Sequence, residues 1–275
     1  MEWISTIPYT GHHSRISNGR LKGSCEWIWG KKEYRDWRSS SVSKLLLLRG
    51  IRKSPHDSRH EYPLTVGIAG AGKTYIASRV IDSFLSNRTS EKLAYFYCNR
   101  AEENRRDPES ILSTLIQQLA QTESEEKLLQ PVVDVYQDRE KKGQKASRLS
   151  LIESQELLVH LADIHPRTTI CIDALDEVEN NNRLKLLKSL KNLVDGAKNL
   201  VKVFATTRMD TDILLQFKMF PRIELVPDDN VGDINQFVKT SLHSAIEEEQ
   251  LLHGIVPSEL EIEICETLCE RSKGM

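Results

Sequence analysis

The motif G-x-x-x-x-G-K-T constrains the fold of this chain more than any other feature. It runs from Gly67 to Thr74 as GIAGAGKT. A loop of this kind joins a buried strand to a helix, and its glycines let successive backbone N–H groups turn toward a phosphate. Lys73 is expected to reach the β- and γ-phosphates, and the Thr74 hydroxyl to bind Mg²⁺. The cradle itself is expected to consist of Gly67, Ala69, Gly70, Ala71 and Gly72. A chance glycine-rich turn in front of a helix is the alternative interpretation.

An acidic strand about a hundred residues downstream is the expected partner of this loop. Residues 169–173 read TICID, an apolar run that ends in a carboxylate. Ligands of open α/β sheets bind at the carboxyl ends of strands, so Asp173 is expected to meet Mg²⁺ there, directly or through water. Asp176 is our first choice for orienting or deprotonating a water that attacks the γ-phosphate, and Glu177 is the second. A solvated acidic loop without a function is the alternative.

A third predicted strand, Leu200 to Ala205, ends in Thr206-Thr207-Arg208. A guanidinium group matches phosphate oxygens with a planar fork, so Arg208 is placed to sense or neutralise a γ-phosphate. An ordinary surface arginine is the alternative. The order along the chain is informative: a phosphate loop, an acidic strand and then a strand that ends in Thr-Arg.

Strand and helix patterns alternate along the chain, which predicts a parallel sheet covered on both faces. The expected fold class is therefore α/β, a P-loop nucleoside triphosphatase sandwich of three layers with a mainly parallel sheet. Asp107-Pro108 and the Ser150/Glu153 capping box mark the starts of two helices. The charged segment Gln137 to Arg148 is expected to be a solvated loop.

Composition excludes several classes of protein. The chain has 275 residues, 39% of them hydrophobic and 28% charged, with a net charge of -2. This charge gives no general attraction to nucleic acid, so nucleic acid is not an expected partner. No apolar run approaches the length of a membrane span, and the start lacks the pattern of a secretory signal. Scattered cysteines, including Cys98 and Cys171 in predicted buried strands, favour free thiols and a cytoplasmic location.

The first 40 residues contain all four tryptophans and one of two histidine pairs. The tryptophans are expected to dock this lead segment onto the domain, with stacking on a nucleotide base as the alternative. His12 with His13, and His56 with His60, lack an acidic or cysteine partner at the spacing of metal ligands. Both pairs are expected to lie on the surface.

The segment in front of the phosphate loop is anomalous. Lys44 to Ile51, KLLLLRGI, has the pattern of the strand that should lead directly into the loop, yet residues 51–67 intervene. They are polar, contain two prolines and two histidines, and show no periodicity. Such a segment is poorly suited to a loop that must be rigid, which favours a retained intron. Its length of seventeen codons would keep the reading frame. A genuine insertion is the alternative, with Leu64 to Val66 as a short replacement strand.

Taken together, several stretches resemble the NACHT nucleotide-binding domains of NLR-like signal-transduction ATPases, in particular the fungal proteins with a nephrocystin-3-like region. These stretches include WISTIPYTGHH, GIAGAGKTYIASRVID, TTICIDALDEV and VKVFATTRMD. The resemblance runs from Trp3 to the last residue. It implies a switch that closes around ATP or GTP with Mg²⁺ and opens for self-association, used in fungal non-self recognition and programmed cell death.

The resemblance also implies a domain organisation. Residues 1–43 would form a lead segment, 44–240 the nucleotide-binding domain with its insertion at 51–67, and 241–275 the start of a truncated helical subdomain. Hydrolysis is expected to be slow or absent, because part of the clamp around the nucleotide would be missing. Two other classes stay open: an interaction module with a disabled site, and a P-loop kinase of small molecules.

Overall fold

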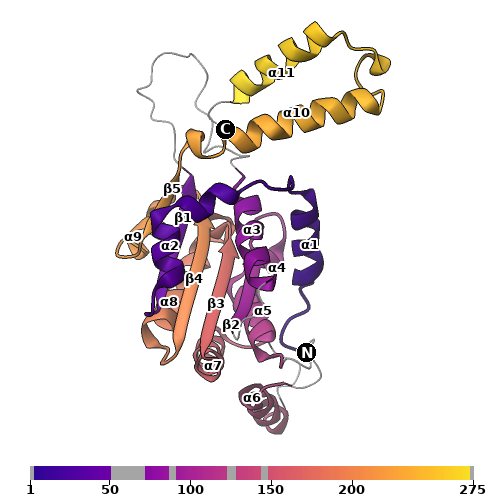
Figure 1. Ribbon diagram of the computed structural model, residues 1–275. Helices are drawn as coiled ribbons and strands as arrows, with labels where there is room; N and C mark the ends of the chain where they lie inside the picture. The colour runs from indigo at the N-terminus through magenta and orange to yellow at the C-terminus, as the bar shows by residue number, and fades with distance from the viewer. Residues whose placement is uncertain (1–2, 51–71, 87–90, 123–127, 144–147, 273–275) are drawn as a thin grey trace.

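The core of the molecule is a parallel sheet with helices on both faces. The computed structural model describes residues 3–50, 72–86, 91–122, 128–143 and 148–272. Within these residues five strands form one sheet in the order β2-β3-β4-β1-β5, and every pairing is parallel (Figure 1). The predicted three-layer α/β sandwich is confirmed. The strands are β1 (Lys44–Gly50), β2 (Glu91–Tyr97), β3 (Arg167–Asp173), β4 (Leu200–Thr207) and β5 (Arg222–Leu225).

The leucine run forms an inner strand of the sheet, as the sequence predicted. β1 pairs with β4 on one side and with β5 on the other. Successive side chains of a strand point to opposite faces, and the leucines follow this rule. Leu45 and Leu47 lie in the apolar cluster on one face, and Leu46 and Leu48 in the cluster on the other. The strand is thus buried from both sides.

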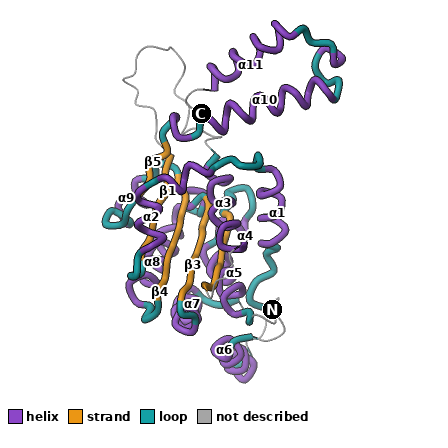
Figure 2. Tube along the Cα trace, viewed as in Figure 1, coloured by secondary structure: helices purple, strands orange, loops and turns teal. Residues whose placement is uncertain are grey.

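Two groups of helices cover the sheet (Figure 2). The side chains of α5, α7 and α8 pack on one face, and those of α2 and α3 on the other. Two predicted caps are confirmed: the Asp107 side chain accepts a bond from Ser110 N, and Ser150 with Glu153 forms a capping box. The helices of the two layers are α2 (Lys32–Ser39), α3 (Lys73–Ser86), α5 (Pro108–Ala120), α7 (Leu151–Ile164) and α8 (Asn180–Gly196).

The lead segment docks onto the sandwich, as expected from its tryptophans: Trp3 and Ile4 pack on the first of these layers, and the apolar residues from Tyr9 onward on the second. Trp37 is fully buried, its ring 5.9 Å from that of Phe204 on β4. Ahead of it, α1 (Tyr9–Gly19) packs against α3 and β2, followed by the turn η1 (Glu26–Gly30). The segment therefore contributes to the core of the sandwich.

The expectation that His13 lies on the surface is wrong, and His12 is half-buried. His13 is buried, where its ring contacts Tyr97 Oη at 2.8 Å and Asp82 Oδ1 at 3.0 Å. Burial lowers the pKa of His13, although the Asp82 carboxylate opposes this shift. His12 lies against the guanidinium of the buried Arg105. Both histidines have polar partners far away in the sequence. The second pair, His56 and His60, lies outside the described residues.

The predicted solvated loop from Gln137 is also wrong in its first part. α6 (Gln130–Lys141) continues through this charged run. Arg139 is buried, with an ion pair to Glu153 at 2.8 Å and a hydrogen bond to Arg148 O. The charge of Arg139 can be buried beside this helix because the Glu153 carboxylate and the Arg148 carbonyl group accept its hydrogen bonds.

The C-terminal part of the described chain is a helical pair, α10 (Val231–Glu247) and α11 (Ser258–Ser272), which stands apart from the sheet (Figure 1). The expected domain boundary after residue 240 falls inside α10. The domain division itself stays a prediction. The remaining elements are α4 (Glu103–Arg106), η2 (Leu175–Glu177), α9 (Thr211–Gln216), η3 (Pro227–Asp229) and η4 (Leu252–Gly254).

Two expectations from composition agree with the structure. Across the described ranges, no helix is long and apolar enough to span a membrane. None of the five cysteines, all of which lie in the described residues, forms a disulfide, and Cys25, Cys98 and Cys171 are buried.

Candidate functional site at the carboxyl edge of the sheet

The carboxyl ends of β1, β3 and β4 meet the first turn of α3 at one edge of the sheet. This meeting follows from the strand order, because β1 ends at Gly50 beside β4, and β4 lies beside β3. All strands run in the same direction, so their last residues share the edge. Side chains from three distant parts of the sequence therefore converge there.

Gly72, Lys73 and Thr74 form the described part of the glycine motif. Gly72 has a φ of +71°, a left-handed conformation that glycine adopts without strain. Lys73 opens α3, and its Nζ lies 3.2 Å from the position that a Cβ on Gly50 would take. The lysine of the motif thus lies beside the end of β1. The predicted cradle residues Gly67, Ala69, Gly70 and Ala71, and the segment 51–67, lie outside the described residues.

Asp173 is held between two threonine hydroxyls. Thr74 Oγ1 donates to Asp173 Oδ2 at 2.8 Å, and Thr206 Oγ1 donates to Asp173 Oδ1 at 2.6 Å. Burial raises the pKa of Asp173, while the two hydroxyl contacts act in the opposite direction. The contact with Thr74 joins the glycine motif directly to the acidic strand.

The donor atoms at this point suit a small hard cation. Magnesium prefers oxygen ligands and usually takes one or two protein groups plus water and phosphate oxygens. The Thr74 hydroxyl and the Asp173 carboxylate are such ligands. Among the described residues, no cluster of three or more His, Cys, Asp or Glu side chains has the arrangement of a metal site. The hydroxyl and the carboxylate suit a cation that completes its coordination with phosphate oxygens and water.

Asp176, Glu177 and Arg208 form a second cluster beside Asp173. Asp176 is buried, and its carboxylate accepts a bond from Arg208 N at 2.8 Å and lies 3.3 Å from Arg208 Nε. The Glu177 carboxylate lies 3.7 Å from Arg208 Nη2 and accepts a bond from Arg100 N. Arg208 is thus paired with both acidic residues in this conformation.

The electrostatics of Lys73 connect the two clusters. Burial lowers the pKa of Lys73, and the nearby Arg208 charge acts in the same direction. Asp176 and Asp173 raise it. These four charges therefore surround one point at the sheet edge, and each predicted site residue that the structure describes lies there.

Sequence reasoning assigned no role to three residues that shape this site. Arg183 of α8 donates to Asp176 O at 3.0 Å, and Arg100 Nη2 donates to the same oxygen at 2.8 Å. Thr206 also accepts a bond from Ala174 N, which fixes the backbone after Asp173. The Thr-Thr-Arg pattern contained a signal for Thr206. Nothing in the local sequence distinguishes Arg183 from a solvated helix residue.

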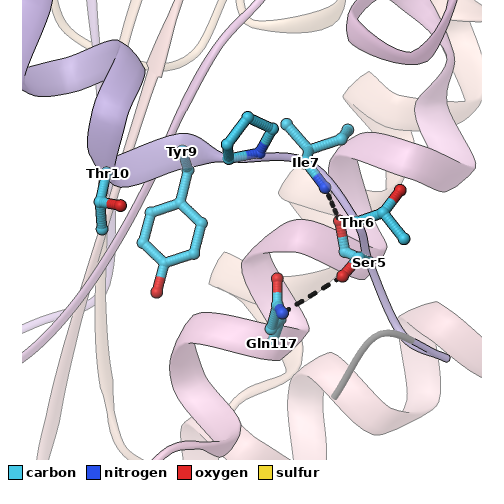
Figure 3. A pocket seen from close by; sticks show the side chains of 7 residues that line it. Ser5, Thr6, Ile7, Tyr9, Thr10 and Gln117 are labelled. Atoms are coloured by element: carbon cyan, nitrogen blue, oxygen red, sulfur yellow. Dashed lines mark hydrogen bonds between the residues drawn. The ribbon is translucent and has the colours of Figure 1, made fainter.

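A separate cavity lies between the lead segment and α5. Its volume is about 290 Å³, and in the close view Gln117 points toward the chain at Ser5 (Figure 3). Gln117 Nε2 donates to Ser5 O at 3.2 Å. None of its lining residues belongs to the strand ends described above. The cavity is lined by residues 5–10 and Gln117.

Comparisons with known proteins place these observations in a family. The family described as "Nephrocystin 3, N-terminal" matches residues 52–208, more than half of the chain. No curated protein matches the sequence. Among solved structures, the Walker-type ATPase PABY2304 of Pyrococcus abyssi is similar, with 15% sequence identity and a TM-score of 0.42. The match covers 97% of this chain and 66% of that protein.

Proposed function

Since the chain belongs to the nephrocystin 3 N-terminal family and has a P-loop nucleotide-binding fold, we propose that it binds ATP or GTP with Mg²⁺ at the carboxyl edge of its sheet. The observation that carries this proposal is the 2.8 Å contact between Thr74 Oγ1 and Asp173 Oδ2. It brings the hydroxyl of the glycine motif to the carboxylate of the acidic strand, across 99 positions of sequence. These are the two protein groups that hold magnesium in P-loop nucleoside triphosphatases.

Each residue of the site has a proposed role. Lys73 contributes its positive charge to the β- and γ-phosphates, and the N-terminus of α3 adds its dipole. Thr74 and Asp173 would hold Mg²⁺, which when bound neutralises phosphate charge. Arg208 is the group that would meet the γ-phosphate. To do so it must exchange its contacts with Asp176 and Glu177 for phosphate oxygens, which a guanidinium group binds well.

We expect hydrolysis of the nucleotide to be slow. Asp176 is the first candidate for orienting water, but its carboxylate already receives the Arg208 backbone N–H and guanidinium. A general base acts only when it reaches the proton that it removes. Glu177, whose side chain is more exposed, is the second candidate. Asp176→Asn should lower the turnover number more than Glu177→Gln, as measured by phosphate release; the opposite order would reverse the two assignments.

Titration with and without Mg²⁺ tests the binding site. In the wild type, Mg²⁺ should strengthen binding of the triphosphate. Thr74→Val removes the hydroxyl ligand and should abolish most of this gain, because the metal loses one of its two protein oxygens. Thr211→Val, at an exposed position of α9, is the matched control. If Mg²⁺ strengthens binding equally in Thr74→Val and the wild type, the proposed metal site is wrong.

The biological role that we propose is that of a fungal NLR-like signalling switch, active in the cytoplasm. The signalling role rests on the sequence resemblance alone. The three buried thiols, which form no disulfide, support the cytoplasmic location, since such thiols suit a reducing compartment. A switch of this kind would self-associate in one nucleotide state. Light scattering in the presence of di- and triphosphate tests this: a change in mass with the nucleotide is expected, and an unchanged monomer in both states would contradict the proposal.

A further inference from the structure

Arg183 is the most deeply buried charged group near the site. Its side chain is 2% exposed, and it lies in the first turns of α8, just after the acidic turn η2. Nη2 donates to Asp176 O at 3.0 Å, and Nε donates to Val178 O at 3.3 Å. Nη1 forms ion pairs with Asp210 at 2.6 Å and Asp212 at 3.2 Å. One guanidinium group thus binds two separate segments of the chain.

These two segments carry Asp176 and Arg208, and their contacts close a ring. Arg183 binds the backbone oxygen of Asp176. The Asp176 carboxylate accepts a bond from Arg208 N at 2.8 Å, and Arg208 O accepts one from Asp210 N at 3.0 Å. The Asp210 carboxylate returns to Arg183. The relative position of the acidic turn and the Arg208 loop therefore depends on Arg183.

Stability alone does not account for a charge at this place. Burying an arginine costs solvation energy, and buried ion pairs can often be replaced by apolar side chains of similar size without loss of stability. An apolar side chain supplies no directional donors to the two carbonyl groups of the acidic turn. The directions of these hydrogen bonds therefore require a guanidinium group here, whereas burial alone does not.

We propose that Arg183 is a positioning residue, which holds Asp176 and Arg208 in the arrangement that recognises the terminal phosphate of a nucleoside triphosphate. This inference rests on the proposed function. Because Lys73 and Thr74 lie on α3, outside the ring, loss of Arg183 should affect the third phosphate and spare the first two. The protein would then lose its preference for triphosphate over diphosphate.

The test measures the ratio of the dissociation constants for ADP and a non-hydrolysable ATP analogue, both with Mg²⁺, and for the matching guanine nucleotides. Arg183→Met should lower this preference by about tenfold and leave diphosphate affinity within about twofold. Arg183→Lys should restore the preference in part, because an ammonium group reaches only some of the same acceptors. Arg208→Met should lower the preference as well. The double variant should lose no more than the larger single loss, since both act through one arrangement.

Arg139→Met is the matched control. Arg139 is also a buried arginine with a carboxylate and a carbonyl partner, but it lies on α6. Its removal should lower thermal stability and leave the preference unchanged. If Arg183→Met does not fold, Asp210→Asn with Asp212→Asn removes the ion pairs from their exposed side and should lower the preference in the same direction.

The outcomes separate the two proposals. A wild type that binds no nucleotide would overturn the proposed function and this inference together. A wild type that prefers triphosphate, with a preference unchanged in Arg183→Met, would overturn the inference alone. An equal loss in Arg139→Met would also overturn it, because the effect would then be a general loss of stability. Full additivity in the double variant would overturn it as well, because Arg183 and Arg208 would then act independently.

Discussion

The sheet and the α10–α11 pair differ most in how much of their apolar surface is buried. In β3 and β4 almost every residue is buried, while in α10 only Leu242 is, and none of residues 258–271 in α11. Phe204 of β4 is fully covered, whereas Phe237 of α10 is 58% exposed. The two helices pack mainly on each other.

Polar contacts connect this helical pair to the rest of the molecule. Lys31 and Asp229 form an ion pair at 2.6 Å, and Cys25 N donates to Asp233 Oδ2 at 2.7 Å. Both link the lead segment to the start of α10. The described residues of the candidate site thus lie on the densely packed part of the fold, whereas partly exposed polar contacts attach the helical pair, which should therefore open at a lower free-energy cost.

The largest expected difference concerns two phenylalanines. Phe204→Ala leaves a cavity beside Tyr34 and Trp37 and should lower the free energy of unfolding by about 3–5 kcal/mol. Phe237→Ala, on the exposed face of α10, should change it by less than about 0.5 kcal/mol. Urea denaturation of both variants measures the difference. Similar losses would show that the helical pair is part of the cooperative core.

The second prediction concerns the connection between β1 and α3, residues 51–72. Deleting 51–67 joins Gly50 to Ile68 and shortens this connection from 22 to 5 residues. Gly50, which lies beside Lys73 Nζ, then becomes the first glycine of G-x-x-x-x-G-K-T. A shorter connection loses less conformational entropy when its ends are brought together on folding. The free energy of unfolding should therefore rise by about 1–1.5 kcal/mol, and nucleotide affinity should rise with it.

Thermal unfolding and nucleotide titration measure both effects, with Gly50→Val in the deletion variant as the control that should lose the affinity again. A deletion variant that unfolds at a lower temperature would make the segment an integral part of the fold. Reading the transcript across the Gly50 and Gly67 codons decides separately whether the segment is a retained intron.

The third prediction uses the raised pKa of Asp173. Because its folded pKa lies above the unfolded value of 3.8, its contribution to stability is fully present below pH 3.8 and is lost as the pH rises through the folded pKa. At pH 7 the buried charge therefore costs stability. Asp173→Asn should raise the melting temperature at pH 7 and flatten its dependence on acidic pH, while the effect of Mg²⁺ on nucleotide binding is lost. Asp195→Asn, at an exposed position, should do neither; a lower melting temperature in Asp173→Asn would contradict the account.

The smallest effect is expected at the attachment of the helical pair. Lys31→Ala removes a partly exposed ion pair, which should cost about 0–1 kcal/mol of unfolding free energy. Limited proteolysis should respond more clearly, with faster cleavage between α10 and α11 than in the exposed control Lys32→Ala. Equal cleavage rates in the two variants would show that this contact does not restrain the helices.

The sequence predicted those parts of the site that depend on local pattern. Asp173 and Arg208 follow apolar runs, and a parallel sheet brings the ends of such runs to one edge. The caps at Asp107 and Ser150 were equally local. In contrast, His13 can be buried because its two ring nitrogens form hydrogen bonds with Tyr97 and Asp82. These partners lie 84 and 69 positions away in the sequence.

The burial of Arg183 and Arg139 could not be predicted from the local sequence either. Each occupies a helical position that resembles a solvated one, and each is buried because carboxylate and carbonyl groups elsewhere in the fold surround it. Tertiary hydrogen bonds leave no periodic trace in a single sequence, so the positioning contacts of the site became visible only in the structure.

Calorimetric titration of Lys73→Ala with Mg·ATP and Mg·GTP tests the central claim most directly. The wild type should bind at least one of the two nucleotides. Lys73→Ala should weaken that binding by about 10- to 100-fold, which corresponds to the 1.5–3 kcal/mol typical of a hydrogen bond to a charged group. Lys218→Ala, at an exposed position, should bind as the wild type does. Equal affinity in Lys73→Ala and the wild type, or no binding by the wild type to either nucleotide, would contradict a phosphate site at this edge of the sheet.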